Sequence, residues 1–395
     1  MRHDDHRAIA RRMELFHLQE EGPGMVFWHP NGFALFRIVE DYVRARMRAA
    51  GFREIRTPQL LDSALWQASG HLEKFRHSMF LVDGGERRLA LKPMSCPGHV
   101  QVFNSRLRSF RELPLRYAEF GHCLRNEASG GLLGLMRTRA FVQDDAHIFC
   151  LEHQVEAEVA AFAALLDRVY RDFGFAEVSV FLAGRPAERA GSESQWDRAE
   201  ALLGAAAAAA GLDIAAKPGE GAFYGPKLEL RLHDSAGRQW QCGTIQLDFV
   251  LPERLDASFV DAAGARARPV MLHQAVLGSL ERFIGVLLEH YCGNLPLWLA
   301  PEQIVLAPLG ADQRDYAREV EALLVGAGYR VRLDDRPERL AKKIVDARAA
   351  GVPLLLVLGP DEAARRAVTL RRRDGSGETL ALESLDGRLR GEAFK

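Results

Sequence analysis

Residues 137–149, RTRAFVQDDAHIF, combine residue types and a spacing that could do chemistry. In a β-strand, alternate side chains point to opposite faces of the sheet. The odd positions then form one row: Arg137, Arg139, Phe141, Gln143, Asp145, His147 and Phe149. The even positions are mostly small and apolar, apart from Asp144. The row is either the solvated outer face of a half-buried sheet or, as its two phenylalanines suggest, the wall of a binding pocket.

The stretch before it, CLRNEASGGLLGLM, adds a second group of charges. Arg125 and Glu127 would lie on a strand that a glycine-containing loop joins to the strand carrying Arg137 and Phe141, so a hairpin would bring all four to one face. Arginine binds phosphate bidentately through its planar fork, and phenylalanine can stack on a base. The alternative is an ordinary surface ion pair between Arg125 and Glu127, and the residues alone leave both readings open.

Two further stretches carry weaker signals. LGSLERFIG places Glu281 and Arg282 on an otherwise apolar helix, between Gly278 and Gly285. A charged pair there is costly unless it is satisfied, so a buried structural ion pair is the alternative to a site. GFREIRTPQLL has a Gly-aromatic start and a proline that ends a strand-like run.

The elements that must position these residues can be read from hydrophobic periodicity. Helices are predicted over 4–20, 33–52, 153–174, 193–213 and 273–291, the last of them buried. Residues 226–234 and 238–249 alternate with period two and predict an antiparallel pair of strands. The first part of the chain therefore predicts an antiparallel sheet with flanking helices.

After residue 300 the pattern changes to alternating strands and helices. Strands are predicted over 303–310, 329–335 and 352–359, with helices over 312–328 and 339–351 between them. Such alternation is typical of a βαβ arrangement. We therefore predict an α/β protein with two domains: an α+β domain over 1–299 with an antiparallel sheet, and an α/β domain over 300–395 with a mixed, mostly parallel sheet.

Composition narrows the class of protein. The 395 residues are 48% hydrophobic and 27% charged, which is ordinary for a globular protein. The net charge of -1 provides no bulk positive field, so any nucleic acid must be bound through local basic patches. The five cysteines form no CxxC pair, which predicts a reducing compartment. The charged N-terminus predicts no signal peptide, and no apolar run is long enough to predict a membrane span.

Taken in order, GFREIRTPQLL, CLRNEASGGLLGLMRTRAFVQDD and LGSLERFIG resemble the three signature motifs of class II aminoacyl-tRNA synthetases. Further stretches are similar to the threonyl-tRNA synthetase family: GPGMVFWHPNG, LALKPMSCPGHV, RYAEFGHCLRNEASG, FVQDDAHIFC, GEGAFYGPKLEL and QCGTIQLDF. The resemblance runs from about residue 4 to the C-terminus. It implies a cytoplasmic, homodimeric threonine–tRNA ligase. Such an enzyme activates L-threonine with ATP and Mg²⁺ to threonyl-adenylate and transfers it to the 3′ end of threonine tRNA.

The resemblance also implies a ligand set. Cys96, His147 and His273 fall where the family holds one Zn²⁺ per subunit, although each could otherwise be a buried cysteine or a satisfied core histidine. Three protein ligands leave a fourth position open for substrate. In the family, zinc binds the amino and hydroxyl groups of threonine, which rejects the near-isosteric valine but not serine. The implied threonine-binding residues are Met94, Asp145, Tyr224 and Gln246.

The implied ATP-binding residues are Arg125, Glu127, Arg137, Phe141, Gln143, Gln241, Thr244 and Arg282. The implied catalytic residues are Arg125, Arg282, His71 and Lys227. Arg125 would hold the α-phosphate, where negative charge develops during carboxylate attack. His71 would assist the transfer step, and its alternative is a histidine in a surface loop. For the residues of the sheet, the alternative is ordinary polar lining.

The C-terminal part resembles the family's anticodon-binding domain. Glu362 and Arg371 match positions that read anticodon bases, whereas Pro337 stands where the family has an asparagine. RRAVTLRRR, residues 365–373, is either a local basic stretch for phosphates or a solvated charge run.

Other positions depart from the family pattern. The departures lie at Leu124, Ala128, Leu133, Ala140, Val142 and Gln274. The family's N-terminal domain, which hydrolyses seryl-tRNA, has no counterpart in these 395 residues, and both a shortened chain and a natural protein without editing fit that. These departures leave a second interpretation open: the protein is a paralogue that resists inhibitors or passes threonine to another acceptor. The retained Arg125, Arg282 and ligand set argue against a third reading, a catalytically inactive tRNA-binding protein.

Overall fold

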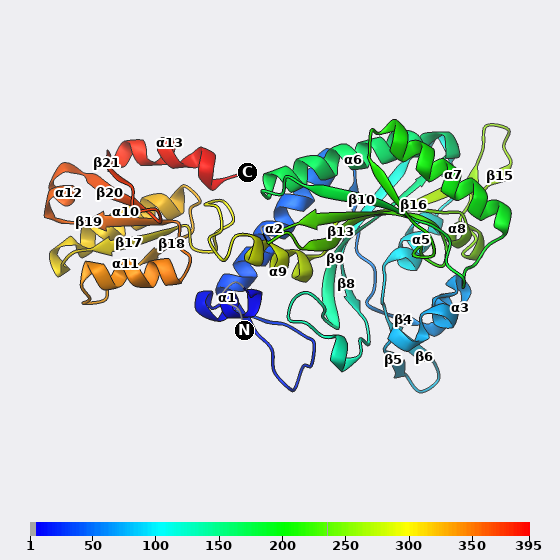
Figure 1. The fold of residues 1–395 in the computed structure, drawn as a ribbon, viewed down its shortest axis with the longest axis horizontal. Helices are drawn as coiled ribbons and strands as arrows, with labels where there is room; N and C mark the ends of the chain where they lie inside the picture. Colours follow the sequence, from blue (N-terminus) through cyan, green and yellow to red (C-terminus); the bar gives the residue numbers. More distant parts are fainter. Residues whose placement is uncertain (1–4, 235) are drawn as a thin grey trace. The chain divides into compact units, whose positions relative to one another are not determined.

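The computed structural model describes residues 5–234 and 236–395 and divides into two compact units (Figure 1). One unit comprises Met1–Gln19, Val26–Tyr42 and Leu288–Lys395, and the other comprises Glu20–Met25 and Val43–Leu287. The division of the chain into domains over 1–299 and 300–395 stays a prediction. We call the second unit the sheet unit, because it contains the largest sheet.

Eight strands form the central sheet of this unit, in the order β11-β10-β12-β13-β16-β9-β8-β3. Their bounds are β3 Arg53–Glu54, β8 Leu115–Leu124, β9 Ala140–Cys150, β10 Val178–Ala183, β11 Ile214–Lys217, β12 Lys227–His233, β13 Gln239–Asp248 and β16 Val270–Ser279. All pairings are antiparallel except the two outermost, β10 with β11 and β3 with β8, which are parallel. The predicted antiparallel sheet, including the β12–β13 pair, is confirmed.

Two long helices, α6 Val155–Asp172 and α7 Glu193–Ala209, lie along one face of this sheet (Figure 1). The Tyr170 hydroxyl donates to the Val276 carbonyl at 2.7 Å and ties α6 to a central strand. Ser192 caps α7 and exchanges hydrogen bonds with Gln195, so this helix begins where its sequence predicts. Both predicted helices are confirmed.

Smaller elements complete the sheet unit. They are α3 Ser63–Ser69, α4 His71–Lys74, α5 Cys96–Asn104, α8 Val250–Arg254, the sheet of β4 Leu60–Asp62, β6 Arg88–Leu91 and β5 Leu81–Asp83, and the sheet of β15 Arg266–Ala267, β14 Phe259–Val260 and β7 Arg108–Ser109. Short 3₁₀ turns lie at Arg76–Ser78, Phe110–Glu112, Ser129–Gly131 and Glu152–Gln154. Helix α2, Pro30–Ala49, which belongs to the other unit up to Tyr42, confirms the helix predicted over 33–52.

The helix predicted over 273–291 is wrong in its first part. Residues Val270–Ser279 form strand β16, and helix α9 covers only Leu280–His290. β16 lies between β13 and β9 and is buried along most of its length, so its sequence is a continuous apolar run without alternation. Periodicity alone cannot distinguish such a run from a buried helix.

In the other unit, five strands form the order β18-β17-β19-β20-β21. They are β17 Ile304–Pro308, β18 Val331–Leu333, β19 Leu354–Leu358, β20 Ala367–Arg372 and β21 Gly377–Ala381. The first three are parallel, while β20 and β21 pair antiparallel. The helices are α10 Arg314–Gly326, α11 Leu340–Ala349, α12 Pro360–Arg365 and α13 Leu382–Ala393, with a 3₁₀ turn at Ala311–Gln313. The predicted alternation of strands and helices is confirmed.

The N-terminal elements of this unit are α1 His6–Met13 and the short strands β1 Phe16–His17 and β2 Phe27–Trp28. The helix predicted over 4–20 is therefore shorter than expected, and Asp4 lies outside the described residues. Within the described part of the chain, no helix combines the length and the apolar character that crossing a membrane requires.

Candidate functional site

Two adjoining cavities open in the sheet unit, with volumes of about 450 and about 380 Å³. The larger is lined, among others, by Met94, Cys96, Asp145, His147, Tyr224, Lys227 and His273. The smaller is lined, among others, by Glu127, Arg137, Phe141, Gln241 and Arg282. Both are lined by Arg125, Gln143, Thr244, Gln246 and Ala275, which form a shared wall. Ligands in the two cavities would therefore meet along this wall.

The β8–β9 hairpin builds much of that wall. Gly121 pairs with Gln143 and Cys123 with Phe141, and the Arg125 amide donates to the Arg139 carbonyl at 2.8 Å beyond the strand end. This register turns the predicted polar row toward the cavities. Two members of the row are exceptions: Arg139 lines neither cavity and donates to the Glu127 carbonyl at 2.8 Å, and the fully buried ring of Phe149 stacks on Phe103 at 4.3 Å between ring centroids.

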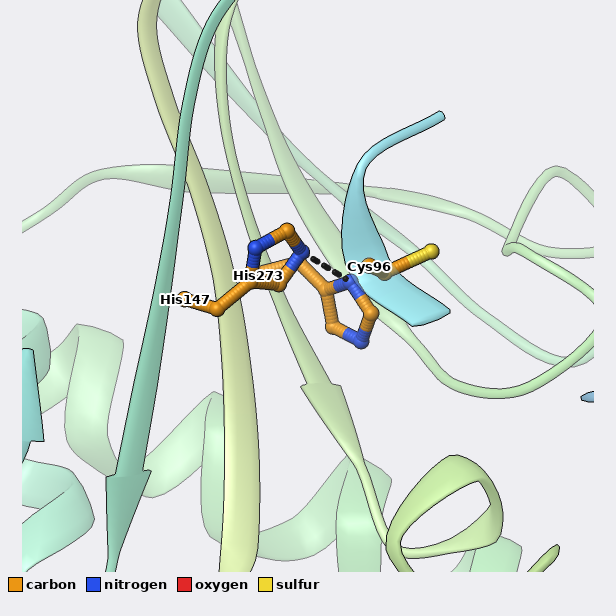
Figure 2. A group of neighbouring side chains, drawn as sticks. All are labelled: Cys96, His147 and His273. Atoms are coloured by element: carbon orange, nitrogen blue, oxygen red, sulfur yellow. Dashed lines mark hydrogen bonds between the residues drawn. The ribbon is translucent and has the colours of Figure 1, made fainter. Parts of the chain in front are cut away.

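One corner of the larger cavity, here called the metal corner, consists of Cys96, His147 and His273 (Figure 2). Cys96 begins α5, while the two histidines face each other across the β9–β16 pairing. Each side chain offers one ligand atom, and these atoms lie within 4.8 Å of one another. The three residues are 2%, 1% and 6% exposed, so the corner is shielded from solvent.

The chemistry of the metal corner fits a divalent ion. Burial, together with the nearby Asp145 and Asp248 carboxylates, raises the pKa of the Cys96 thiol well above its usual value. Without a cation the thiol stays protonated there, whereas a bound metal stabilises the thiolate. One thiolate and two imidazoles are a zinc-type donor set with an open fourth position. The residues present therefore fit Zn²⁺.

Carboxylates and hydroxyls surround the metal corner. An Asp145 oxygen lies 3.7 Å from Nε2 of His147, and the Ser95 amide donates to the other Asp145 oxygen at 3.2 Å. The Tyr224 hydroxyl donates to Gln246 at 2.8 Å, and its ring stacks on His273 at 4.7 Å.

The turn that presents Tyr224 needs a glycine at 225. A Cβ on Gly225 would lie 1.9 Å from the Leu247 carbonyl oxygen, so no larger residue fits. Met94 lines the same cavity. The turn and strand β13 therefore hold Tyr224 and Gln246 in fixed positions beside the metal corner.

Three arginines, Arg125, Arg137 and Arg282, form the arginine corner of the smaller cavity. Nε of Arg125 donates to the Pro93 carbonyl at 3.1 Å, and its guanidinium lies 5.1 Å from the centroid of the Phe141 ring. Nε of Arg282 donates to the Met136 carbonyl at 2.9 Å. Backbone carbonyls thus orient both guanidiniums at the edge of the cavity.

The charged residues of the two predicted ion pairs have other partners in the structure. Glu127 pairs with Arg137, at 2.8 Å, rather than with Arg125. Glu281 and Arg282 point to different partners: Glu281 accepts from the Val142 amide at 3.0 Å, whereas Arg282 turns to the cavity. Neither a surface pair of Arg125 and Glu127 nor a buried pair of Glu281 and Arg282 describes these residues.

Two buried carboxylates fasten the start of α9 to β9, and we call them the carboxylate clasp. Asp144 accepts three backbone amides, from Val276, Leu277 and Gly278, each at 2.8 Å. Glu281 reaches the opposite way to the Val142 amide. Burial raises the pKa of each carboxyl group to about 7. The clasp fixes the short segment between the metal corner and Arg282.

The remaining predicted residues of the sheet unit occupy less central places. Lys227 lines the larger cavity and binds Glu229 at 2.8 Å, while the Gln241 carbonyl accepts from Arg282 at 3.5 Å. His71 lines neither described cavity and is fully buried, with Nε2 3.6 Å from the Cys96 sulfur. Burial lowers the pKa of His71 to about 3. His71 is thus not a surface loop histidine.

The two predicted anticodon residues lie in the other unit. Glu362, on α12, accepts from the Thr369 hydroxyl at 2.7 Å, and Arg371, on β20, is exposed. In the basic stretch 365–373, Arg366 pairs with Glu319, Arg372 pairs with Glu392, and Arg373 donates to the Leu295 carbonyl. Three of the arginines in this stretch are therefore already bound to groups within the chain.

Four polar residues behind the metal corner were not predicted from the sequence: Lys92, His99, Glu119 and Asp248. All four are at most 3% exposed. His99 lies three residues after Cys96 on α5, and Asp248 lies two residues after Gln246 on β13. The helical and strand spacings could have indicated these two. Lys92 and Glu119 have no such local signal, because each is polar in a segment that reads as apolar strand or loop.

Comparison with known proteins agrees with this architecture. Residues 75–291 match the family described as tRNA synthetase class II core domain (G, H, P, S and T), and residues 303–392 match an anticodon binding domain. Over 381 residues the chain is 56% identical to a threonine–tRNA ligase of Caulobacter vibrioides, covering 96% of the chain and 58% of that relative. A threonine–tRNA ligase of Paramagnetospirillum magneticum is 55% identical over 391 residues, covering 98% of the chain and 61% of that relative.

A solved structure covers the chain more evenly. The crystal structure of the RNA binding domain of threonyl-tRNA synthetase from Cryptosporidium parvum is 40% identical, with a TM-score of 0.96 and 99% of each chain covered. The chain thus spans about 60% of the length of these two curated relatives but 99% of this solved structure. The chain belongs to the class II tRNA synthetases and, within them, to the threonyl-tRNA synthetase family.

Proposed function

We propose that the chain is the catalytic part of a threonine–tRNA ligase. It would activate L-threonine with ATP and Mg²⁺ and transfer the threonyl group to the 3′ end of threonine tRNA. One observation carries the proposal: the metal corner and the arginine corner open onto cavities that share one wall. If an amino acid and ATP bound in these cavities, the carboxylate of the amino acid would lie beside the α-phosphate of the ATP.

The larger cavity would select the amino acid. Cys96, His147 and His273 would hold Zn²⁺, which when bound supplies an open coordination position that favours an amino acid with a hydroxyl group. Asp145, buried beside His147, would accept hydrogen bonds from the substrate ammonium group. Tyr224 and Gln246, joined by a 2.8 Å hydrogen bond, would close the side of this cavity.

The smaller cavity would hold ATP. Phe141 offers an aromatic face for the adenine, and Gln143, Thr244 and Gln241 offer polar groups along the wall. Arg125 belongs to both cavities, so its guanidinium would lie beside the α-phosphate as the carboxylate attacks. Arg282 would stack on the other side of the adenine, Arg137 would reach the outer phosphates, and Glu127 orients Arg137 through their ion pair.

The transfer step and the tRNA contacts remain further proposals. His71 would influence the transfer step from behind Cys96, and Lys227 would act from the cavity rim. Glu362 and Arg371 would contact anticodon bases. We also propose a cytoplasmic homodimer, since in class II synthetases the motif that resembles residues 51–61 usually forms the dimer interface. Light scattering of the purified protein tests the oligomeric state.

ATP–pyrophosphate exchange with threonine, serine and valine, run beside aminoacylation of threonine tRNA transcript, tests the main proposal. We expect exchange with threonine, weaker exchange with serine and almost none with valine, because only the first two carry a hydroxyl group. We also expect charging of the tRNA. Exchange with valine as strong as with threonine would contradict the selection. Exchange without charging would instead favour a paralogue that serves another acceptor.

A further inference from the structure

The two imidazoles of the metal corner face each other through one ring nitrogen each. Nε2 of His147 lies 3.0 Å from Nδ1 of His273 (Figure 2). A neutral imidazole carries its proton on only one nitrogen, and the partner of that nitrogen decides which one. The other nitrogen of each ring contacts a buried side chain, His99 for His147 and Asp248 for His273. The hydrogen bonds of these side chains therefore show where each imidazole carries its proton.

The first chain of partners begins at Glu119, which is 3% exposed. One of its oxygens accepts from the Thr57 amide at 3.0 Å and from the Lys92 ammonium at 2.7 Å. The other accepts from the Thr57 hydroxyl at 2.8 Å and faces Nε2 of His99 at 3.1 Å. Burial alone would raise the pKa of Glu119, but the donors His99, Lys92 and Thr57 outweigh it and lower the pKa to about 2.

An ionised Glu119 can only accept, so Nε2 of His99 must carry a proton. With that proton on Nε2, a neutral His99 presents a bare Nδ1. That atom lies 2.9 Å from Nδ1 of His147, which must donate. Nε2 of His147 is then left bare.

The second chain reaches the same result for the other imidazole. Asp248 is fully buried, and one of its oxygens accepts from the Val250 and Leu251 amides at 2.6 and 3.0 Å. Its other oxygen lies 2.8 Å from Nε2 of His273, which therefore carries the proton. Nδ1 of His273 is bare as well. Two bare nitrogens cannot hydrogen-bond to each other, but together they make a pair of donors for a Lewis acid.

We propose that Lys92, Glu119 and His99 form a positioning relay that fixes the tautomer of His147, so that its Nε2 lone pair faces the metal position. The inference rests on the metal site of the proposed function. The two imidazole ligands differ in how a carboxylate orients them. Asp248 contacts His273 directly, whereas Glu119 acts on His147 through His99.

The relay makes a specific prediction for Glu119→Gln. On the side that faces the Thr57 amide and the Lys92 ammonium, only an oxygen fits, because both neighbours are donors. The new NH₂ group must then point to His99 and donate to its Nε2. His99 would move its proton to Nδ1 and donate to His147, which would move its own proton to Nε2. Zinc affinity should fall about 10- to 100-fold.

Zinc affinity measured by chelator competition on the folded full chain tests the relay, with histidine ¹⁵N NMR reporting the tautomer of His147. Glu158→Gln is the matched control, because Glu158 is 4% exposed and bound to Arg116 at 2.6 Å, and it belongs to neither the metal corner nor the relay. We expect its zinc affinity to stay within about twofold of the parent chain. We expect the Nε2–H tautomer of His147 in Glu119→Gln but not in the control.

A pair of substitutions at His99 keeps the test decisive if Glu119→Gln does not fold. In His99→Gln, the carbonyl can accept from His147 while the amide donates to Glu119, so the direction of the relay survives. His99→Leu removes both functions. We expect the glutamine variant to keep zinc affinity within a few-fold and the leucine variant to lose about 10- to 100-fold.

The outcomes separate the relay from the proposed function. Unchanged zinc affinity in both Glu119→Gln and His99→Leu would overturn the relay, even if the parent chain binds zinc and activates threonine. If the parent chain binds no zinc, the metal site and the relay both fail. Zinc binding that follows the relay pattern without threonine-dependent exchange would support the relay and contradict the proposed function.

Discussion

The metal corner and the arginine corner share a wall but are held in place differently. Cys96 and His147 are at most 2% exposed, and hydrogen-bonded side chains surround the imidazoles. The side chain of Arg137 is 54% exposed, and those of Arg125 and Arg282 are oriented through backbone carbonyls. Buried side chains thus order the metal corner before any ligand arrives, whereas under the proposed function the nucleotide would complete the ordering of the exposed Arg137.

The largest expected effect concerns the shared arginine. Arg125→Ala should lower threonine-dependent ATP–pyrophosphate exchange by about 1,000-fold, because among the described residues no other arginine lines both cavities. Zinc content should not change. Arg171→Ala, which removes an exposed arginine on α6, is the control. Exchange at the parental rate in Arg125→Ala would contradict the assignment.

Substitution of a proposed metal ligand tests the metal corner. Cys96→Ser should weaken zinc binding by more than about 100-fold, because it removes the thiolate from a three-residue ligand set. Threonine-dependent exchange should fall with it. The control is Cys150→Ala, a fully buried cysteine on the same strand as His147. Metal analysis that finds full zinc content in Cys96→Ser would show that the ligand set is wrong.

The carboxylate clasp links the two corners, and a substitution there should have an intermediate effect. In Asp144→Asn, the amide group can no longer accept all three backbone amides, so the free energy of unfolding should drop by about 1–3 kcal/mol. The KM for ATP should rise about tenfold, because Arg282 follows the clasped segment. Zinc affinity should change little. An unchanged KM would mean that the clasp serves stability alone.

The smallest expected effect is a pH dependence at the other carboxylate of the clasp. Burial raises the pKa of Glu281 from an ordinary 4.5 to about 7, so the folded state holds this proton more tightly than the unfolded state. The stability that the proton contributes is fully present below pH 4.5 and is lost as the pH rises through 7. Glu281→Gln should remove this loss.

Urea unfolding at pH 5.5 and pH 8 measures the effect. Between these values the parent chain should lose on the order of 1 kcal/mol more than Glu281→Gln. Glu156→Gln, which changes an exposed carboxylate on α6, should leave the parental pH dependence in place. Equal losses in the parent chain and in Glu281→Gln would mean that Glu281 does not titrate in this range.

The features that the sequence predicted well are those set by neighbours along the chain. The alternation of 137–149 correctly turned Gln143 and Asp145 toward a cavity, because a strand alternates whatever surrounds it. The same rule failed for Phe149, whose side chain fills the core where the strand leaves the cavity. His273 was placed on a helix because a strand buried on both faces has lost its alternation.

The features that the sequence could not provide depend on contacts between distant residues. Glu119 receives donors from Thr57, Lys92 and His99, which lie on separate segments of the chain. No local pattern marks Glu119 as different from any charged residue in a strand. The metal ligands themselves came from a family resemblance, since Cys96, His147 and His273 have no spacing that indicates a site. Their convergence is a property of the fold alone.

Strand β16 contains a bulge between Ala275 and Ser279, which limits how this chain can vary in length. The step from Ala275 to Ser279 lies opposite the step from Asp145 to Gln143, so β16 carries two more residues than its partner there. Inserting or deleting one residue in this segment would exchange the faces of the strand and turn either His273 or Arg282 away from its cavity. Length changes between these two residues should therefore be the least tolerated in the sheet unit, whereas the open turn at Gly85 leaves room for them.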